Sequence, residues 1–184
     1  VKIGEPGIAA DVFLQENVPG WLYQVKMGAT TIWERWDAIA PDGTIYNPQM
    51  NSYNHYAYGA VCQWLFESVA GFRPDAADPG FRTVIFEPTI IPELSPVEAR
   101  HDSRAGTVRA GWTVSGHKVR YELTVPAASR GILRLSGHHN IIVDGSGWAG
   151  GERELAPGPH LITFDFVAPE RLDLEKLDIN ARTP

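Results

Sequence analysis

Apolar and polar residues alternate over two consecutive stretches, 108–114 and 119–125, and this alternation limits the fold more than any other feature. Successive side chains of a β-strand point to opposite faces of a sheet, so each stretch predicts a strand with one buried face. The three residues 115–117, SGH, join the two stretches as a hairpin loop. The same period of two returns at Val84 and Phe86, Leu133 and Leu135, Ile141 and Val143, and Ile162, Phe164 and Phe166. Short strands with frequent turns predict an antiparallel β-sandwich.

A helical pattern fills the first part of the chain. Residues 8–16 contain no helix breaker, and residues 20–27 place apolar side chains on one face of a short helix. The strongest helical pattern covers residues 53–70, and Gly71 is a natural residue to end it. The single cysteine, Cys62, lies in this apolar helical setting, which predicts a buried thiol.

The period changes at a cluster of helix breakers, RPDAADPG. We therefore predict an α+β chain in two parts, with a helical part over 1–72, a linker over 73–80, a β-sandwich over 81–168 and a tail over 169–184. Two or three helices in roughly 70 residues cannot bury their apolar faces alone. We expect the sandwich or a second copy of the chain to cover that surface, so the chain is a candidate homo-oligomer.

The composition excludes several classes of function. A net charge of −6 argues against a polyanionic partner such as nucleic acid. No apolar run approaches the roughly 20 residues that span a bilayer, and one cysteine allows no intrachain disulfide. The histidines have no metal-ligand spacing, and we predict neither a metal nor a cofactor. The chain opens on Val1 without a leader, so we expect a fragment of a longer protein whose compartment the sequence does not give.

One carboxylate, Glu34, lies between two tryptophans, Trp33 and Trp36, in the segment TTIWERWD. Such a carboxylate is either a surface charge or an acid/base group in an aromatic-lined cleft, where ring faces can stack on a sugar. The two tryptophans accordingly predict either a stacking wall or part of a helical core. The threonine, isoleucine and tryptophan content favours an extended backbone over 30–36, which would place Trp36 on the face of Glu34.

A second segment, MNSYNHYAYGAV, gathers polar and aromatic residues just before the strongest helical pattern. Binding residues often lie at such junctions between loops and regular elements. His55 in this segment is compatible with three roles: a hydrogen-bond partner of a sugar hydroxyl, a capping or core residue, and a metal ligand.

Together, TTIWERWD and MNSYNHYAYGAV resemble the C-terminal part of the catalytic domain of bacterial α-L-rhamnosidases of glycoside hydrolase family 78. The resemblance covers roughly the first 90 residues well and the β-rich remainder more loosely. It implies the terminal helices of an (α/α)6 barrel followed by an antiparallel β-sandwich. It also implies that Glu34 is a general base, that His55 contacts rhamnose, and that rhamnose-containing glycosides are the substrates.

The family's scheme is hydrolysis with inversion, which needs a second carboxylic group to protonate the departing oxygen. The resemblance implies that this acid lies in an earlier part of the family's barrel, which this chain does not contain, and Asp37, Asp42 and Glu67 are poor substitutes for it. The fragment alone is then expected to have little or no turnover. Two alternatives stay open. One is another inverting enzyme with an (α/α)6 barrel; the other is a non-catalytic sugar-binding or structural module that uses Trp112 or Trp148.

Overall fold

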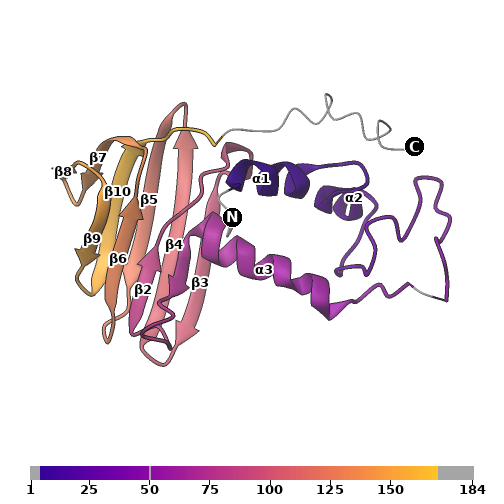
Figure 1. The fold of residues 1–184 in the computed structure, drawn as a ribbon, viewed down its shortest axis with the longest axis horizontal. Helices are drawn as coiled ribbons and strands as arrows, with labels where there is room; N and C mark the ends of the chain where they lie inside the picture. The colour runs from indigo at the N-terminus through magenta and orange to yellow at the C-terminus, as the bar shows by residue number, and fades with distance from the viewer. Residues whose placement is uncertain (1–4, 50, 170–184) are drawn as a thin grey trace, which may run out of the picture. The chain divides into compact units, whose positions relative to one another are not determined.

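The computed structural model describes residues 5–49 and 51–169 of the 184-residue chain (Figure 1). The chain divides into two compact units, one ending at residue 59 and one spanning residues 60–168. The predicted tail lies outside the described residues apart from its first residue. The domain limits predicted from the sequence stay a prediction, and the structure itself places residues 73–80 within the second unit.

The first unit begins with two short helices, α1 (Pro6–Leu14) and α2 (Trp21–Lys26), close to the ranges that the sequence predicts. The expectation of an extended segment over 30–36 is wrong, because these residues form bends and turns with no strand. The physical reason is the partner of this segment. Single backbone hydrogen bonds join it to residues 52–55, and two isolated bonds do not make a ladder.

A continuous helical stretch leads from the first unit into the second. It is built from three consecutive elements: the 3-10 helix η1 (Tyr56–Ala60), α3 (Val61–Trp64) and the π-helix η2 (Leu65–Ala70). Gly71 ends it with φ +79°, and a Cβ there would lie 2.3 Å from Cα of Pro88, so only glycine fits. The prediction of a buried thiol is wrong: Cys62 is exposed, because only the last residues of this stretch, Val69 and Ala70, are buried.

Ten strands form the rest of the second unit, and they belong to two sheets. In chain order they are β1 (Phe72–Pro74), β2 (Thr83–Phe86), β3 (Val97–Ser103), β4 (Gly106–Ser115), β5 (Lys118–Val125), β6 (Arg130–Leu135), β7 (His139–Val143), β8 (Ser146–Trp148), β9 (Gly151–Leu155) and β10 (Gly158–Asp165). A short 3-10 helix, η3 (Pro92–Leu94), precedes β3. The smaller sheet has the order β1-β2-β6-β9 and the larger has the order β3-β4-β5-β10-β7-β8. This arrangement is the antiparallel sandwich that the alternating stretches predict.

One strand pair departs from the antiparallel pattern. β2 and β6 run parallel, with Thr83 opposite Arg130 and Phe86 opposite Leu133. Forty-three residues separate the two strands in the chain, and parallel neighbours need such a long crossover. Sequence alternation reports which face of a strand is buried, but it carries no information about the direction of the neighbouring strand.

Two buried aromatic side chains of the larger sheet tie down the end of the helical stretch. The indole Nε1–H of Trp112 donates to the carbonyl oxygen of Val69 at 2.7 Å. The hydroxyl of Tyr121 donates to the carbonyl oxygens of Ala70 and Gly71 at 3.2 and 3.3 Å, and burial raises the pKa of this phenol. The last carbonyls of a helix have no partner within the helix, so the sandwich supplies the donors that they lack.

Two aspartates of the second unit are expected to make the sandwich less stable at acidic pH. The pKa of Asp78 is lowered first by its hydrogen bond from Thr83, and that of Asp102 first by its hydrogen bond from Thr107. A carboxyl whose pKa is lower in the folded state stabilises that state above its unfolded pKa, about 3.9, and the contribution is lost as pH falls through the folded pKa. We expect the urea midpoint of the sandwich to be level near neutral pH and to fall below about pH 4.

Urea unfolding of the 184-residue chain at a series of pH values, followed by far-ultraviolet circular dichroism, measures this effect. Asp102→Asn serves as the matched variant, because it removes one of the titrating carboxyls and should make the decline shallower. A midpoint that rises as the pH falls would contradict the assignment.

Candidate functional site

The two motif segments of the sequence lie against each other in the first unit. The backbone amide of Glu34 donates to the carbonyl oxygen of Ser52 at 2.8 Å, and the amide of His55 donates to the carbonyl oxygen of Ile32 at 2.8 Å. The hydroxyl of Thr31 donates to the carbonyl oxygen of Tyr53. These bonds join residues 18 to 23 positions apart, so the structure brings the segments of Glu34 and His55 together.

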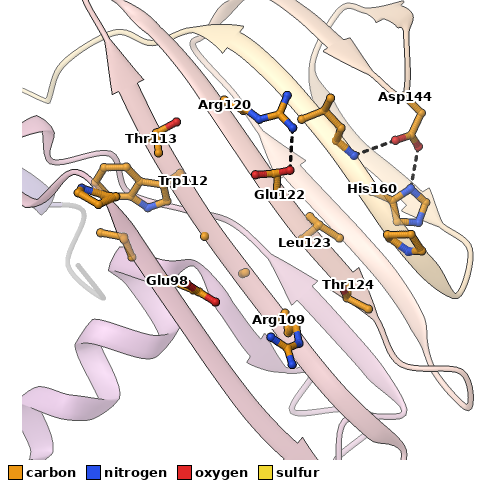
Figure 2. A pocket seen from close by; sticks show the side chains of 16 residues that line it. Glu98, Arg109, Trp112, Thr113, Arg120, Glu122, Leu123, Thr124, Asp144 and His160 are labelled. Atoms are coloured by element: carbon orange, nitrogen blue, oxygen red, sulfur yellow. Dashed lines mark hydrogen bonds and ion pairs between the residues drawn. The ribbon is translucent and has the colours of Figure 1, made fainter.

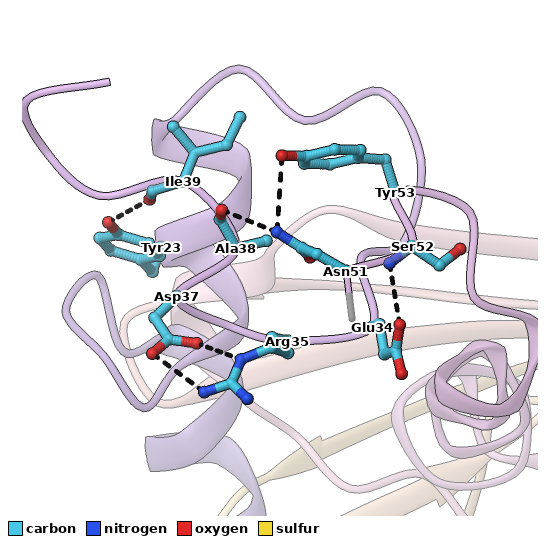
Figure 3. Close-up of polar contacts among 9 residues, drawn as sticks. All are labelled: Tyr23, Glu34, Arg35, Asp37, Ala38, Ile39, Asn51, Ser52 and Tyr53. Atoms are coloured by element: carbon cyan, nitrogen blue, oxygen red, sulfur yellow. Dashed lines mark hydrogen bonds and ion pairs between the residues drawn. The ribbon is translucent and has the colours of Figure 1, made fainter. Parts of the chain in front are cut away.

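The carboxylate of Glu34 is held by the second segment as well. Its Oε2 accepts a hydrogen bond from the backbone amide of Ser52 at 2.8 Å, as Figure 3 shows. A backbone amide is a fixed donor, so this bond orients the carboxylate. The side chain is half-buried, and Oε1 forms no hydrogen bond to a described residue. One carboxylate oxygen is therefore anchored and the other is available to a ligand or a water molecule.

Aromatic rings connect Trp36 to His55. Trp21 contacts Trp36 and Tyr58 edge to face, with centroids 6.3 and 6.2 Å apart. The ring of His55 lies 5.6 Å from Tyr58 and stacks 5.9 Å from Tyr56. Nε1 of Trp36 and Nδ1 of His55 are both buried without a hydrogen-bond partner among the described residues. Buried polar atoms are normally paired, so these two atoms are candidates for hydrogen bonds to a ligand.

Trp33 occupies a different environment from Trp36. Its side chain is 4 % exposed, and its ring packs edge to face on Tyr53 with centroids 5.8 Å apart. Its backbone amide donates to Oε1 of Gln24 at 3.1 Å. This burial favours the core alternative for Trp33, whereas Trp36 is half-buried and belongs to the aromatic cluster.

The other acidic residues near Glu34 have local partners. Asp37 forms an ion pair with Arg35 at 3.1 Å, drawn in Figure 3, and this hydrogen bond raises the pKa of Arg35. The guanidinium of Arg35 also lies 4.0 Å from the ring centroid of Tyr46. Asp42 accepts from the amide of Thr44 at 2.9 Å, which closes a turn and lowers the pKa of Asp42. Each of these aspartates already has a structural role.

Four residues contribute to the site without having been predicted from the sequence. The amide of Ser52 orients Glu34, but a backbone group has no signature in a sequence. Trp21 and Tyr58 complete the aromatic cluster, yet they lie in separate segments whose contact depends on the tertiary fold. Asn51 has a signal in hindsight, since its Nδ2 donates to the carbonyl oxygen of Ala38 at 3.0 Å and asparagine often braces loops this way.

The remaining candidates divide by exposure. Trp112 is 1 % exposed with its indole bonded inside the second unit, so it cannot stack on a ligand at the surface. Trp148, at the end of β8, is half-buried. Within residues 5–49 and 51–169, no three side chains of metal-ligating type gather in one place. No helix in the same ranges has the length and apolar character needed to cross a bilayer.

Two family models match the chain in succession. The model described as the bacterial alpha-L-rhamnosidase 6 hairpin glycosidase domain matches residues 1–69. The model described as the bacterial alpha-L-rhamnosidase C-terminal domain matches residues 71–147. The residues of the candidate site all fall in the first match, and most of the sandwich falls in the second.

Curated relatives carry the same description. An alpha-L-rhamnosidase of Streptomyces avermitilis is 40 % identical over 109 residues, which are 59 % of this chain and 10 % of the relative. An alpha-L-rhamnosidase of an Alteromonas species is 34 % identical over 142 residues, which are 77 % of this chain and 15 % of the relative. The chain therefore spans only a small part of the length of these relatives.

Solved structures agree with the sequence comparisons. The crystal structure of Streptomyces avermitilis alpha-L-rhamnosidase complexed with L-rhamnose matches 84 % of this chain with a TM-score of 0.72 and 31 % identity. The crystal structure of the Aspergillus terreus enzyme of that name matches 84 % with a TM-score of 0.72 and 32 % identity. The chain covers 16 % and 17 % of those two chains, respectively.

Proposed function

This chain belongs to the bacterial α-L-rhamnosidases as a C-terminal fragment, and we propose that the full-length parent hydrolyses terminal α-L-rhamnosides with inversion. In this proposal Glu34 is the general base. It takes a proton from the water molecule that attacks the anomeric carbon, while an acid on the opposite face protonates the departing oxygen. Rhamnose-containing glycosides are the proposed substrates.

The anchored carboxylate of Glu34 is the observation that carries this proposal. A general base must present one oxygen to a water molecule in a fixed direction, and the amide of Ser52 holds the other oxygen at 2.8 Å. The bond between the amide of His55 and the carbonyl of Ile32 keeps the His55 segment beside it. We propose that His55 contacts the rhamnose and that Trp36 lines the same cleft, where an aromatic wall suits the apolar face of the sugar.

The general acid is proposed to lie in the part of the parent that this chain does not contain. Inversion requires two carboxyl groups about 6.5–9.5 Å apart. Within the described residues, Asp37 is paired with Arg35, Asp42 closes a turn, and Glu67 accepts from Nε2 of Gln63 at 2.8 Å. Each of these carboxyl groups already has a local partner, so we propose that none of them is the acid. Association of two copies through the helical part stays a prediction.

Hydrolysis of an aryl α-L-rhamnoside by the purified 184-residue chain and by the full-length parent tests this division of the machinery. We expect turnover by the parent and none above background by the chain, because a base without its acid leaves the departing oxygen unprotonated. Circular dichroism of the chain is the control that it is folded in the assay. Substantial turnover by the chain would place both carboxyl groups within it and contradict the proposal.

A further inference from the structure

A groove of about 620 Å³ lies on the larger sheet, lined by β3, β4, β5 and β10 (Figure 2). Arg109, Gly111 and Thr113 alternate along β4 with Ala110 and Trp112, which are buried in the core. The groove is therefore on the outer face of the sheet, away from the core. Its volume falls in the range of about 300–1,000 Å³ that small-ligand sites occupy.

A row of three residues crosses the floor of the groove. Glu98 of β3 is opposite Gly111 of β4, and Gly111 is opposite Glu122 of β5. Since neighbouring strands lie about 4.8 Å apart, the Cα atoms of the two glutamates are roughly 10 Å apart. A Cβ at Gly111 would lie 2.7 Å from the carbonyl oxygen of Val97, so this position stays bare. The two carboxylates thus flank a strip of exposed backbone, on either side of β4 in Figure 2.

The charged groups around the groove differ in how they are paired. Glu122 accepts from Nη2 of Arg120 at 2.7 Å, a bond drawn in Figure 2. Glu98 has no hydrogen bond or ion pair through its side chain to any residue that the structure describes, and the guanidinium of Arg109 has none either. Asp102 already accepts from Thr107 and Arg100, which lower its pKa most, and Arg109 adds only a weaker charge effect. One acceptor and one donor are thus left without a bonded partner.

These groups select a class of ligand. The guanidinium groups of Arg109 and Arg120 repel a cation, and the carboxylates of Glu98 and Glu122 repel an anion. A neutral hydroxyl can donate to a carboxylate and accept from a guanidinium at once, and neighbouring hydroxyls on a sugar ring present several such pairs. We propose that the groove is a saccharide-binding site in which Glu98 accepts from, and Arg109 donates to, hydroxyls of a neutral sugar.

Binding of a sugar in this groove would require neither Glu34 nor catalysis. The sugar lies over the bare backbone at Gly111, with the hydroxyls of Thr113 and Thr124 beside it. Trp112 is 1 % exposed, and the imidazole of His160 is already bonded to Asp144 and to the carbonyl oxygen of Ala156, so the lining offers no tryptophan, tyrosine or phenylalanine ring for stacking. Without a stacking platform the affinity is weak, with a Kd on the order of 1 mM.

Amide chemical shifts of the ¹⁵N-labelled 184-residue chain provide the test, with methyl α-L-rhamnoside and methyl α-D-glucoside as probes up to about 50 mM. We expect saturable shifts at Gly111 and Thr124 with at least one probe. Glu98→Gln and Arg109→Gln are each expected to weaken binding about tenfold, because each substitution replaces a charged hydrogen-bonding group with a neutral one. Both side chains are exposed, so neither substitution is expected to unfold the chain, and the spectra themselves report whether each variant is folded.

Glu154→Gln, on the smaller sheet, and Arg104→Gln, in the turn between β3 and β4, are the matched controls and should titrate as the unaltered chain does. Two results would overturn the proposal: no shift at Gly111 and Thr124 with either probe, or a Glu98→Gln variant that binds as tightly as its control. Shifts confined to Trp36 and His55 would support the site in the first unit and count against the groove.

Discussion

Replacing Glu34 with glutamine in the full-length enzyme is expected to lower kcat by about 10²–10⁴-fold, the range that general acid–base catalysis contributes. Glutamine has the shape of glutamate, and its amide oxygen can still accept from the amide of Ser52, so the local structure is retained. In the proposed role of general base, Glu34 would lose the basicity that takes a proton from water. Initial rates with an aryl α-L-rhamnoside measure the loss, and KM is expected to change much less than kcat.

Two acidic neighbours provide the controls. Asp37→Asn breaks an ion pair in which both side chains are more than a third exposed, and exposed pairs contribute little to stability. Asp42→Asn weakens the turn that closes on Thr44. Both variants are expected to retain kcat within a few-fold. If Glu34→Gln keeps full activity, or if Asp37→Asn loses as much, the assignment of the base is wrong.

Truncating Trp112 to alanine is expected to destabilise the sandwich by about 3–5 kcal/mol, the usual cost of removing a large buried aromatic side chain. Its ring is 1 % exposed, and its Nε1–H is the donor that satisfies the carbonyl of Val69. The substitution therefore leaves both a cavity and an unpaired buried carbonyl. Urea unfolding followed by far-ultraviolet circular dichroism measures the change in the free energy of unfolding without relying on tryptophan emission.

Trp148→Ala is the matched control, because it removes the same side chain from a half-buried position at the end of a short strand. We expect a much smaller loss from it. Tyr121→Phe isolates the hydrogen bond from the ring, since it deletes only the hydroxyl that donates to Ala70 and Gly71, and is expected to cost about 1–2 kcal/mol. Equal losses from Trp112→Ala and Trp148→Ala would show that burial of the ring is not what stabilises the sandwich.

The sequence predicts those elements in which burial or backbone conformation dictates the residue type at each position. Strands β4 and β5 alternate because every second side chain enters the core, and the predicted hairpin joins them through residues 116–117, with Ser115 paired to Lys118. The helical stretch ends at Gly71, as predicted, because a left-handed residue is needed there. The expectation of a buried Cys62 is wrong because an apolar sequence neighbourhood does not say which face of a helix is covered.

The tertiary contacts of the candidate site could not be predicted from local sequence patterns. The residues 30–36 have the composition of a strand, but their hydrogen bonds go to residues 52–55 and to Gln24, and no local pattern encodes those partners. Glu34 and His55 were identified by resemblance and not by their spacing, and their assigned roles stay predictions. The parallel pairing of β2 with β6 escaped for a similar reason, since direction is decided by the crossover between the strands.

The bonds from Trp112 and Tyr121 to the end of the helical stretch have a consequence for anyone who builds chimeric enzymes. A chimera joined at residue 70, between the two matched domains, would take Val69 and Ala70 from one protein. The side chains that donate to them, Trp112 and Tyr121, would come from another. Such a junction would separate the two sides of a buried interface, whereas a junction before η1 would keep the helical stretch and the sheet from the same protein.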